Sequence, residues 1–209
     1  MKKLVLFGEI PVNCYIIEHN NKCYIIDPGY EKERVIEYIK KYNLEVLGIL
    51  LTHGHIDHIG AINAFDVPVY LHEKEFEIIE DNVKNGFKFY GREKEYELKD
   101  INLIPIYDEY VLNLDDKQIV TMYTPGHTIG GVCYKIEDDL YTGDTLFENA
   151  VGKWTFPTGD LETLKRTVVN LIDSQEEHIK IHPAHGASST IGQEKKYNDF
   201  YVQWKKELG

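Results

Sequence analysis

The stretch from Thr52 to Gly60 constrains this chain more than any other, because it places metal-binding side chains directly after an apolar segment. Residues 46–51 form an apolar run closed by a turn signal, which is typical of a buried strand. Small residues and spaced apolar side chains after Asp57 predict a helix that begins near that residue. The sequence therefore predicts a turn between a buried strand and a helix, where a rigid scaffold commonly carries functional residues.

This turn holds three histidines and one aspartate within six residues: His53, His55, Asp57 and His58. His53 and His55 are two residues apart, so in an extended turn their side chains can point to the same side. Asp57 and His58 are adjacent and must diverge, which suits two neighbouring metal ions better than one. A single loop histidine is usually an ordinary surface or core residue, and an aspartate at a helix start is usually an N-cap. Burying all four side chains together without a cation would cost desolvation free energy that no interaction offsets. We therefore interpret the cluster as a metal site.

The segments around this turn predict an α/β chain in which strands and helices alternate. Two apolar runs, residues 14–17 and 23–26, are separated by a hairpin signal at 19–22, so the first sheet is expected to be mixed rather than purely parallel. Short runs separated by turns between residues 101 and 141 predict a second group of antiparallel strands. Further strands are expected at 67–71 and 179–181, helices at 31–43, 73–83, 160–172 (with Asp160 as N-cap) and 193–207, and a connecting loop at 85–91.

A chain of 209 residues with 43% hydrophobic content is long enough to bury one core, so we expect a single domain, residues 1–209. Its formal net charge of −12 argues against nucleic acid as a partner, because phosphate binding needs a basic surface, and against an anionic membrane. The start of the sequence does not resemble a secretory signal, and no apolar run approaches the roughly 20 residues of a membrane-spanning helix. We therefore expect a cytoplasmic protein that acts on a small-molecule substrate.

Three cysteines, Cys14, Cys23 and Cys133, lie in strand-like runs and show no close C-x-x-C spacing. An odd number in this arrangement argues against a disulfide framework and against a thiolate zinc site. We expect these thiols to pack as small apolar side chains.

Three later strand ends each place one metal-competent residue beside a glycine in a tight turn: His127 in 124–128, Asp144 in 142–145 and His185 in 183–186. Alone, each would be interpreted as a cap or turn residue. With the first cluster they make five histidines and two aspartates, a nitrogen and oxygen set without thiolate that points to Zn²⁺, Fe or Mn²⁺. Asp27, in the turn 27–29, could initiate that turn or orient a metal-bound imidazole.

The motif Thr52-His53-x-His55-x-Asp57-His58, followed by His127, Asp144 and His185 in this order, resembles the signature of the metallo-β-lactamase superfamily. Residues 27–29, 124–128 and 142–147 resemble the glyoxalase II branch most. The resemblance implies a four-layer αβ/βα sandwich of two mixed β-sheets with flanking helices. It also implies two divalent ions: His53, His55 and His127 would hold the first, Asp57, His58 and His185 the second, and Asp144 would bridge both.

Two departures bear on the substrate. The ending departs from the full-length glyoxalase II enzymes, whereas residues 152–156 depart from the shorter relatives and begin like the substrate-binding G-K-F-Y stretch of glyoxalase II. The chain stops soon after 183–186, as in short members without the C-terminal helical domain, and it carries their ending Ile-Gly-x-Glu at 191–194. Residues 152–156 read G-K-W-T-F, whereas the short relatives usually have G-R-T-D-F. Lys153 could contact a substrate carboxylate or be a surface lysine, and Trp154 could form a substrate wall or belong to the core. His182 matches no ligand of the family and is expected to be structural.

The ligand set predicts hydrolysis by a hydroxide that bridges the metals, because zinc lowers the pKa of bound water from near 16 to about 7. Asp57 would also hold that hydroxide in line. A thiolate leaving group needs little acid help, so the leading hypothesis is a thioesterase for S-2-hydroxyacyl thiols. The alternatives are a persulfide dioxygenase with one Fe(II) held by His53, His127 and Asp144, a lactonase with the same binuclear centre, and a binding module without catalysis. A binding module has no need for all seven ligands, and all seven are present.

Overall fold

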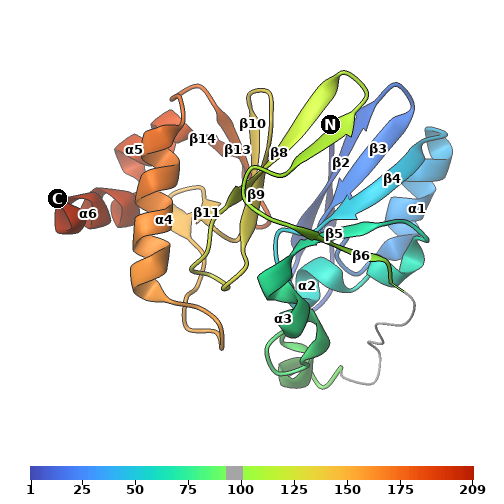
Figure 1. Ribbon diagram of the computed structural model, residues 1–209, viewed down its shortest axis with the longest axis horizontal. Helices are drawn as coiled ribbons and strands as arrows, with labels where there is room; N and C mark the ends of the chain where they lie inside the picture. The colour runs from blue at the N-terminus through green and yellow to red at the C-terminus, as the bar shows by residue number, and fades with distance from the viewer. Residues whose placement is uncertain (93–100) are drawn as a thin grey trace. The chain divides into compact units, whose positions relative to one another are not determined.

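The computed structural model describes residues 1–92 and 101–209, and Figure 1 shows how the elements follow one another. Its contacts divide the chain into two compact units. Unit 1 comprises Met1–Ile106 and Asn113–Lys117, and unit 2 comprises Tyr107–Leu112 and Gln118–Gly209. None of the helices among the described residues combines the length and the apolar character needed to cross a lipid bilayer.

The six-stranded sheet of unit 1 is mixed, as predicted. Its strands lie in chain order: β1 (Lys2–Leu6), β2 (Val12–His19), β3 (Lys22–Ile26), β4 (Glu45–Leu50), β5 (Val69–His72) and β6 (Leu103–Ile106). The first three strands pair antiparallel, and β3 to β6 pair parallel. Because β3 and β4 run in the same direction, the turn after β3 and the histidine-rich turn after β4 emerge at the same edge of the sheet.

The helices of unit 1 are shorter than the sequence predicted. They are α1 (Lys32–Lys41), α2 (Ile56–Ile59) and α3 (Phe76–Glu80), with 3-10 turns at Ile62–Ala64, Glu73–Glu75 and Phe87–Tyr90. The helix expected over 73–83 ends early because the Asp81 carboxylate accepts hydrogen bonds from the backbone N–H groups of Val83 and Lys84 and closes a turn. The loop expected at 85–91 contains a 3-10 turn, and residues 93–100 lie outside the described residues.

The sheet of unit 2 is also mixed. Its strand order is β14 (Ser189–Thr190), β13 (Lys180–Pro183), β10 (Asp139–Gly143), β9 (Val132–Ile136), β8 (Lys117–Tyr123) and β7 (Val111–Leu114), and β11 (Leu146–Phe147) pairs with β12 (Ala150–Val151). Strands β8, β9 and β10 alternate in direction, and β10 and β13 are parallel. It follows that β8, β10 and β13 all end at one edge, so the loops carrying His127, Asp144 and His185 leave the sheet on the same side.

Three helices pack together in unit 2: α4 (Leu161–Ser174), α5 (Ile191–Tyr197) and α6 (Asp199–Leu208) (Figure 1). Helix α4 begins as predicted, with the Asp160 carboxylate accepting from the Thr163 N–H at 2.7 Å. Its buried face, including Leu164, Val168 and Ile172, packs in one cluster with Trp204 of α6.

The prediction of a single C-terminal helix over 193–207 is wrong, because the chain forms two helices, α5 and α6, on either side of Asn198. The Asn198 side-chain oxygen accepts from the N–H groups of Phe200 and Tyr201 and thereby caps α6. Its amide donates to the Ala150 carbonyl and to the Glu194 carboxylate. An Asn-Asp pair is a sequence signal for a helix start, and here that signal outweighs the continuous amphipathic pattern.

The three cysteines are fully buried free thiols, as predicted. Cys14 lies in β2 and Cys23 in β3, both in unit 1, whereas Cys133 lies in β9 of unit 2. Burial raises the pKa of Cys23 to about 12 and that of Cys133 to about 11, and burial also raises the pKa of Cys14 well above its usual range. The thiols therefore stay protonated and act as small apolar groups.

Candidate metal centre

The histidine-rich turn of unit 1 carries four buried metal-competent side chains between β4 and the end of α2. His53, His55, Asp57 and His58 are each at most 8% exposed. His53 Nε2 lies 3.0 Å from His55 Nδ1, and the carboxylate of Asp57 lies 3.5 Å from His58 Nε2. Groups this close can share a proton or together face a cation, and burial makes uncompensated charge costly in either case.

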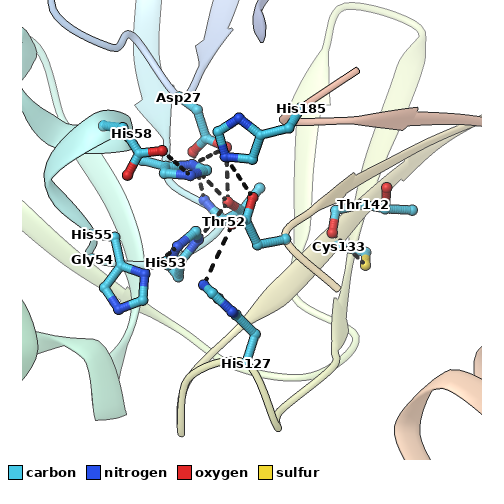
Figure 2. A network of polar contacts seen from close by, with 12 residues as sticks. Asp27, Thr52, His53, Gly54, His55, His58, His127, Cys133, Thr142 and His185 are labelled. Atoms are coloured by element: carbon cyan, nitrogen blue, oxygen red, sulfur yellow. Dashed lines mark hydrogen bonds and ion pairs between the residues drawn. The ribbon is translucent and has the colours of Figure 1, made fainter. Parts of the chain in front are cut away.

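Asp27, directly after β3, holds this turn in position through contacts with Thr52 and His58. Its Oδ1 accepts the Thr52 N–H at 2.9 Å, and its Oδ2 accepts the Thr52 hydroxyl at 2.8 Å and lies 2.9 Å from His58 Nδ1 (Figure 2). The backbone of Asp27 has a φ of 50°, so the residue also shapes the turn. Asp27 thus shapes the turn through its backbone and contacts the His58 imidazole through its carboxylate, which are the features that the two roles considered for it require.

These contacts determine which ring nitrogens of unit 1 carry a proton. The Thr52 hydroxyl donates its only hydrogen to Asp27, so its oxygen accepts from His53 Nδ1 at 3.1 Å. His58 Nδ1 likewise donates to the second carboxylate oxygen of Asp27. Both rings are therefore held as the Nδ1–H tautomer, and both direct a lone pair from Nε2, which is the form that binds a metal ion.

The turn is also fixed from the segment after β5. Glu75 is fully buried, and its carboxylate accepts the N–H of Gly54, between His53 and His55, at 2.8 Å. One residue beyond His55, the Ile56 N–H donates to the carbonyl of the buried Asn85 at 2.8 Å. The backbone is thus held on both sides of His55, which fixes the spacing of the two imidazoles.

Replacing Glu75 with alanine should therefore weaken metal binding as well as folding. The substitution leaves the Gly54 N–H buried without this acceptor, at a cost of about 1–3 kcal/mol. The free energy of unfolding of the metal-free protein in urea and the metal affinity from chelator competition are the measurements. Glu75→Gln is the matched control, because it keeps an acceptor oxygen and removes only the charge. Equal damage from both variants would assign the effect to the charge instead.

Unit 2 presents His127, Asp144 and His185 on the three loops that leave one edge of its sheet. His127 Nδ1 lies 2.7 Å from the Lys153 carbonyl and donates to it, so its Nε2 carries the lone pair. That Nε2 lies 3.5 Å from Asp144 Oδ2, and His185 Nε2 lies 3.3 Å from Asp144 Oδ1. One carboxylate therefore faces an imidazole with each of its two oxygens.

Gly152 allows the backbone at Lys153 to approach this group. A Cβ at position 152 would lie 1.7 Å from the Asp144 carbonyl oxygen and 3.1 Å from His127 Nδ1. No other residue fits there without displacing His127 or Asp144. The backbone of 152–153 thus fixes the His127 ring, a role that a carbonyl group plays without any sequence signal of its own.

The other residues considered from the sequence lie as follows. The Lys153 side chain is exposed, with its ammonium 5.0 Å from the centroid of the Phe156 ring. Trp154 packs edge-on against Phe200 and Trp204, so its side chain packs against the core of unit 2. His182, in β13, contacts Asp139 through Nε2 at 2.7 Å and Ser188 through Nδ1 at 3.1 Å.

The donor set of each unit fits divalent metal ions. Both sets consist of neutral imidazole nitrogens and carboxylate oxygens without thiolate, and acceptors within each unit hold three of the imidazoles in the metal-binding tautomer. Two mixed sheets flanked by helices, with such donors at their strand ends, define a metal-binding α/β protein.

Comparison with known proteins identifies the family. Residues 7–179 match the model of the metallo-β-lactamase superfamily, so the chain belongs to this superfamily and has its α/β fold. Members bind divalent metal ions, and the chain is a hydrolase-like member. It is 35% identical to the probable metallo-hydrolase YqgX of Bacillus subtilis, over 92% of this chain and 93% of that protein. It is 34% identical to the hydroxyacylglutathione hydrolase GloC of Haemophilus influenzae, over 90% and 92%.

Two solved structures are similar over nearly the whole chain. The BLEG-1 B3 metallo-β-lactamase has a TM-score of 0.87 at 33% identity, covering 96% of this chain and 99% of that one. TTHA1623 in a di-iron-bound form has a TM-score of 0.82 at 28% identity, covering 96% and 100%.

Proposed function

We propose that this protein is a metal-dependent thioesterase that cleaves S-2-hydroxyacyl thiols and that residues 1–209 act as one catalytic domain. The observation that carries the proposal is the set of imidazoles held in the metal-binding tautomer by Asp27, Thr52 and the Lys153 carbonyl. Similarity to a hydroxyacylglutathione hydrolase over most of both chains supports the substrate class.

In this proposal the donors of both units bind the same two divalent ions. His53, His55 and His127 hold the first ion, Asp57, His58 and His185 hold the second, and Asp144 bridges them. Zn²⁺ is the first choice for an imidazole and carboxylate set, with Fe and Mn²⁺ as alternatives. The di-iron-bound relative supports considering iron.

Bound metal ions would supply an acidified water molecule and polarise the thioester carbonyl. The residues of the chain prepare this reaction. Asp57 orients the attacking water and accepts a hydrogen bond from it, while Asp27 and Thr52 keep His58 and His53 in position. The water oxygen bonds to the carbonyl carbon and releases one proton to solvent, the C–S bond breaks, and its electron pair leaves on sulfur as a thiolate. A thiolate leaves without a general acid, which explains why a site without a suitably placed acid would favour thioesters over amides.

The test is a substrate panel on protein stripped of metal and reloaded with Zn²⁺, Fe²⁺ or Mn²⁺. We expect S-lactoylglutathione to be hydrolysed with a kcat/KM on the order of 100-fold above that for the matching amide, and only by reloaded protein. Metal analysis should give two ions per chain. Absence of thioester turnover in every metal form would refute the proposal.

A second candidate activity is hydrolysis of β-lactams, which the similarity to the B3 metallo-β-lactamase favours. The same panel therefore includes a chromogenic β-lactam, a lactone and a glutathione persulfide with oxygen-uptake detection. Turnover of one of these without thioester turnover would reassign the centre to a lactamase, a lactonase or a dioxygenase. Turnover of none would favour a binding module.

A further inference from the structure

Tyr30 occupies a slot that two glycines keep open beside the histidine-rich turn. A Cβ at Gly8 would lie 1.9 Å from Tyr30 Cδ2, and a Cβ at Gly60 would lie 2.6 Å from Tyr30 Cδ1. The ring is therefore held between these two glycines along both of its edges. Gly60 ends helix α2 and lies three residues after Asp57, so the ring lies against the helix that carries this metal-competent carboxylate.

The hydroxyl of Tyr30 is buried, and among the described residues it has no hydrogen-bond partner. A buried hydroxyl without a partner is unfavourable, so such a group in a fixed position is matched to a ligand or a water molecule. Packing against Gly8 and Gly60 on both edges of the ring prevents the side chain from shifting sideways toward another partner within the protein. The hydroxyl is thus rigidly presented beside the α2 turn.

The charges around Tyr30 favour a neutral ligand group. Arg92 lies over the ring, with its guanidinium carbon 5.9 Å from the ring centroid, and it is paired with Glu9 at 2.8 Å. That pair has no net charge, so it gives a charged group of a ligand no unbalanced partner beside the ring. Burial, and then the charges of Asp57 and Glu9, raise the pKa of the Tyr30 phenol well above its usual range, which keeps it protonated as a hydrogen-bond donor.

We propose that the Tyr30 hydroxyl donates a hydrogen bond to the hydroxyl oxygen next to the thioester carbonyl of the substrate, and so selects 2-hydroxyacyl groups. This inference rests on the proposed thioesterase function, because that function brings the reacting carbonyl to the metal held by Asp57. A neutral hydroxyl suits this position because the Tyr30 phenol is itself uncharged and the Arg92–Glu9 pair beside it carries no net charge. Tyr30 is then a specificity residue rather than a metal-positioning one.

The experiment compares two substrates that differ by one hydroxyl, S-lactoylglutathione and S-propionylglutathione, in the wild type and in Tyr30→Phe. We expect the ratio of kcat/KM for S-lactoylglutathione to that for S-propionylglutathione to fall about tenfold in the variant. The hydrogen bond forms only when both the Tyr30 hydroxyl and the substrate hydroxyl are present. Metal content should be unchanged, and the melting temperature should be unchanged or higher. Tyr201→Phe is the matched control, since its buried hydroxyl donates to Asp173 at 2.8 Å in unit 2.

Calorimetry provides a readout that does not depend on turnover. Metal-loaded wild type should bind lactate more tightly than propionate, and Tyr30→Phe should lose this difference while Tyr201→Phe keeps it. If the wild type hydrolyses no thioester, the proposed function fails, but the calorimetric comparison still decides the role of Tyr30. An unchanged preference in Tyr30→Phe, no lactate preference in the wild type, or loss of metal from the variant would each overturn the inference.

Discussion

Replacing Asp144 with asparagine should abolish turnover and release metal. Asp144 directs one oxygen to within 3.5 Å of His127 Nε2 and the other to within 3.3 Å of His185 Nε2, so it is the group best placed to join two ions. Asparagine removes the charge and offers only one acceptor oxygen. A loss of about 4 kcal/mol of stabilisation corresponds to a decrease on the order of 1000-fold in kcat/KM. Metal stoichiometry by mass spectrometry should fall in parallel.

Asp139→Asn is the control for this experiment. Asp139 also pairs with a histidine in unit 2, His182, at 2.7 Å, and it opens the same strand β10 that precedes Asp144. Because neither partner belongs to the proposed ligand set, this variant should keep its metal and its activity. An Asp144→Asn protein that retained two ions and near-normal turnover would contradict the bridging assignment.

The second large effect is expected from Asp27→Asn. Asparagine tolerates the positive φ of this position, so the turn should persist, but it has one acceptor oxygen where Asp27 uses two. Because the Thr52 backbone N–H cannot reverse its direction, the asparagine oxygen should face that N–H and its NH2 group should face His58 Nδ1. His58 should then shift its proton to Nε2, the atom required for the metal. We expect metal affinity to fall about 10–100-fold, as is typical when the partner of a metal-binding histidine is lost.

Two measurements check this prediction. Chelator competition gives the metal affinity, and nitrogen-15 NMR of the imidazoles in the metal-free protein gives the tautomer of His58. Asp116→Asn is a matched control, because Asp116 pairs with His19 at an exposed position of unit 1. Weakened binding with the His58 proton still on Nδ1 would show that Asp27 acts through its charge rather than through the tautomer.

The loops that carry the candidate ligands could be predicted because each combines local signals. The turn after β4 follows an apolar run, and the positions of His127, Asp144 and His185 each follow a strand and adjoin a glycine. The mixed first sheet followed from the hairpin signal near the N-terminus, whereas the parallel pairing of β10 with β13 in the second sheet did not follow from local signals. These features depend on residues close in sequence, which is where pattern analysis is strongest.

The features that sequence analysis missed depend on contacts between distant residues. Glu75 lies in an acidic stretch that reads as a solvated helix, yet it is fully buried because its carboxylate accepts from Gly54, 21 residues away. The Lys153 carbonyl fixes His127 through a backbone atom, which the residue type does not encode. The continuous C-terminal helix was predicted because its amphipathic pattern hides the capping role of Asn198. Tertiary partners override local preference in each case.

The three buried thiols allow local unfolding of the chain to be measured by their reactivity. A thiol reacts with alkylating reagents through its thiolate, so Cys14, Cys23 and Cys133 can be modified only when the surrounding sheet opens to water. Because two of them lie in the first sheet and the third lies in the second, pulse labelling followed by peptide mass mapping separates the opening rates of the two units. Coincident labelling at all three positions would mean that both halves melt as one cooperative body.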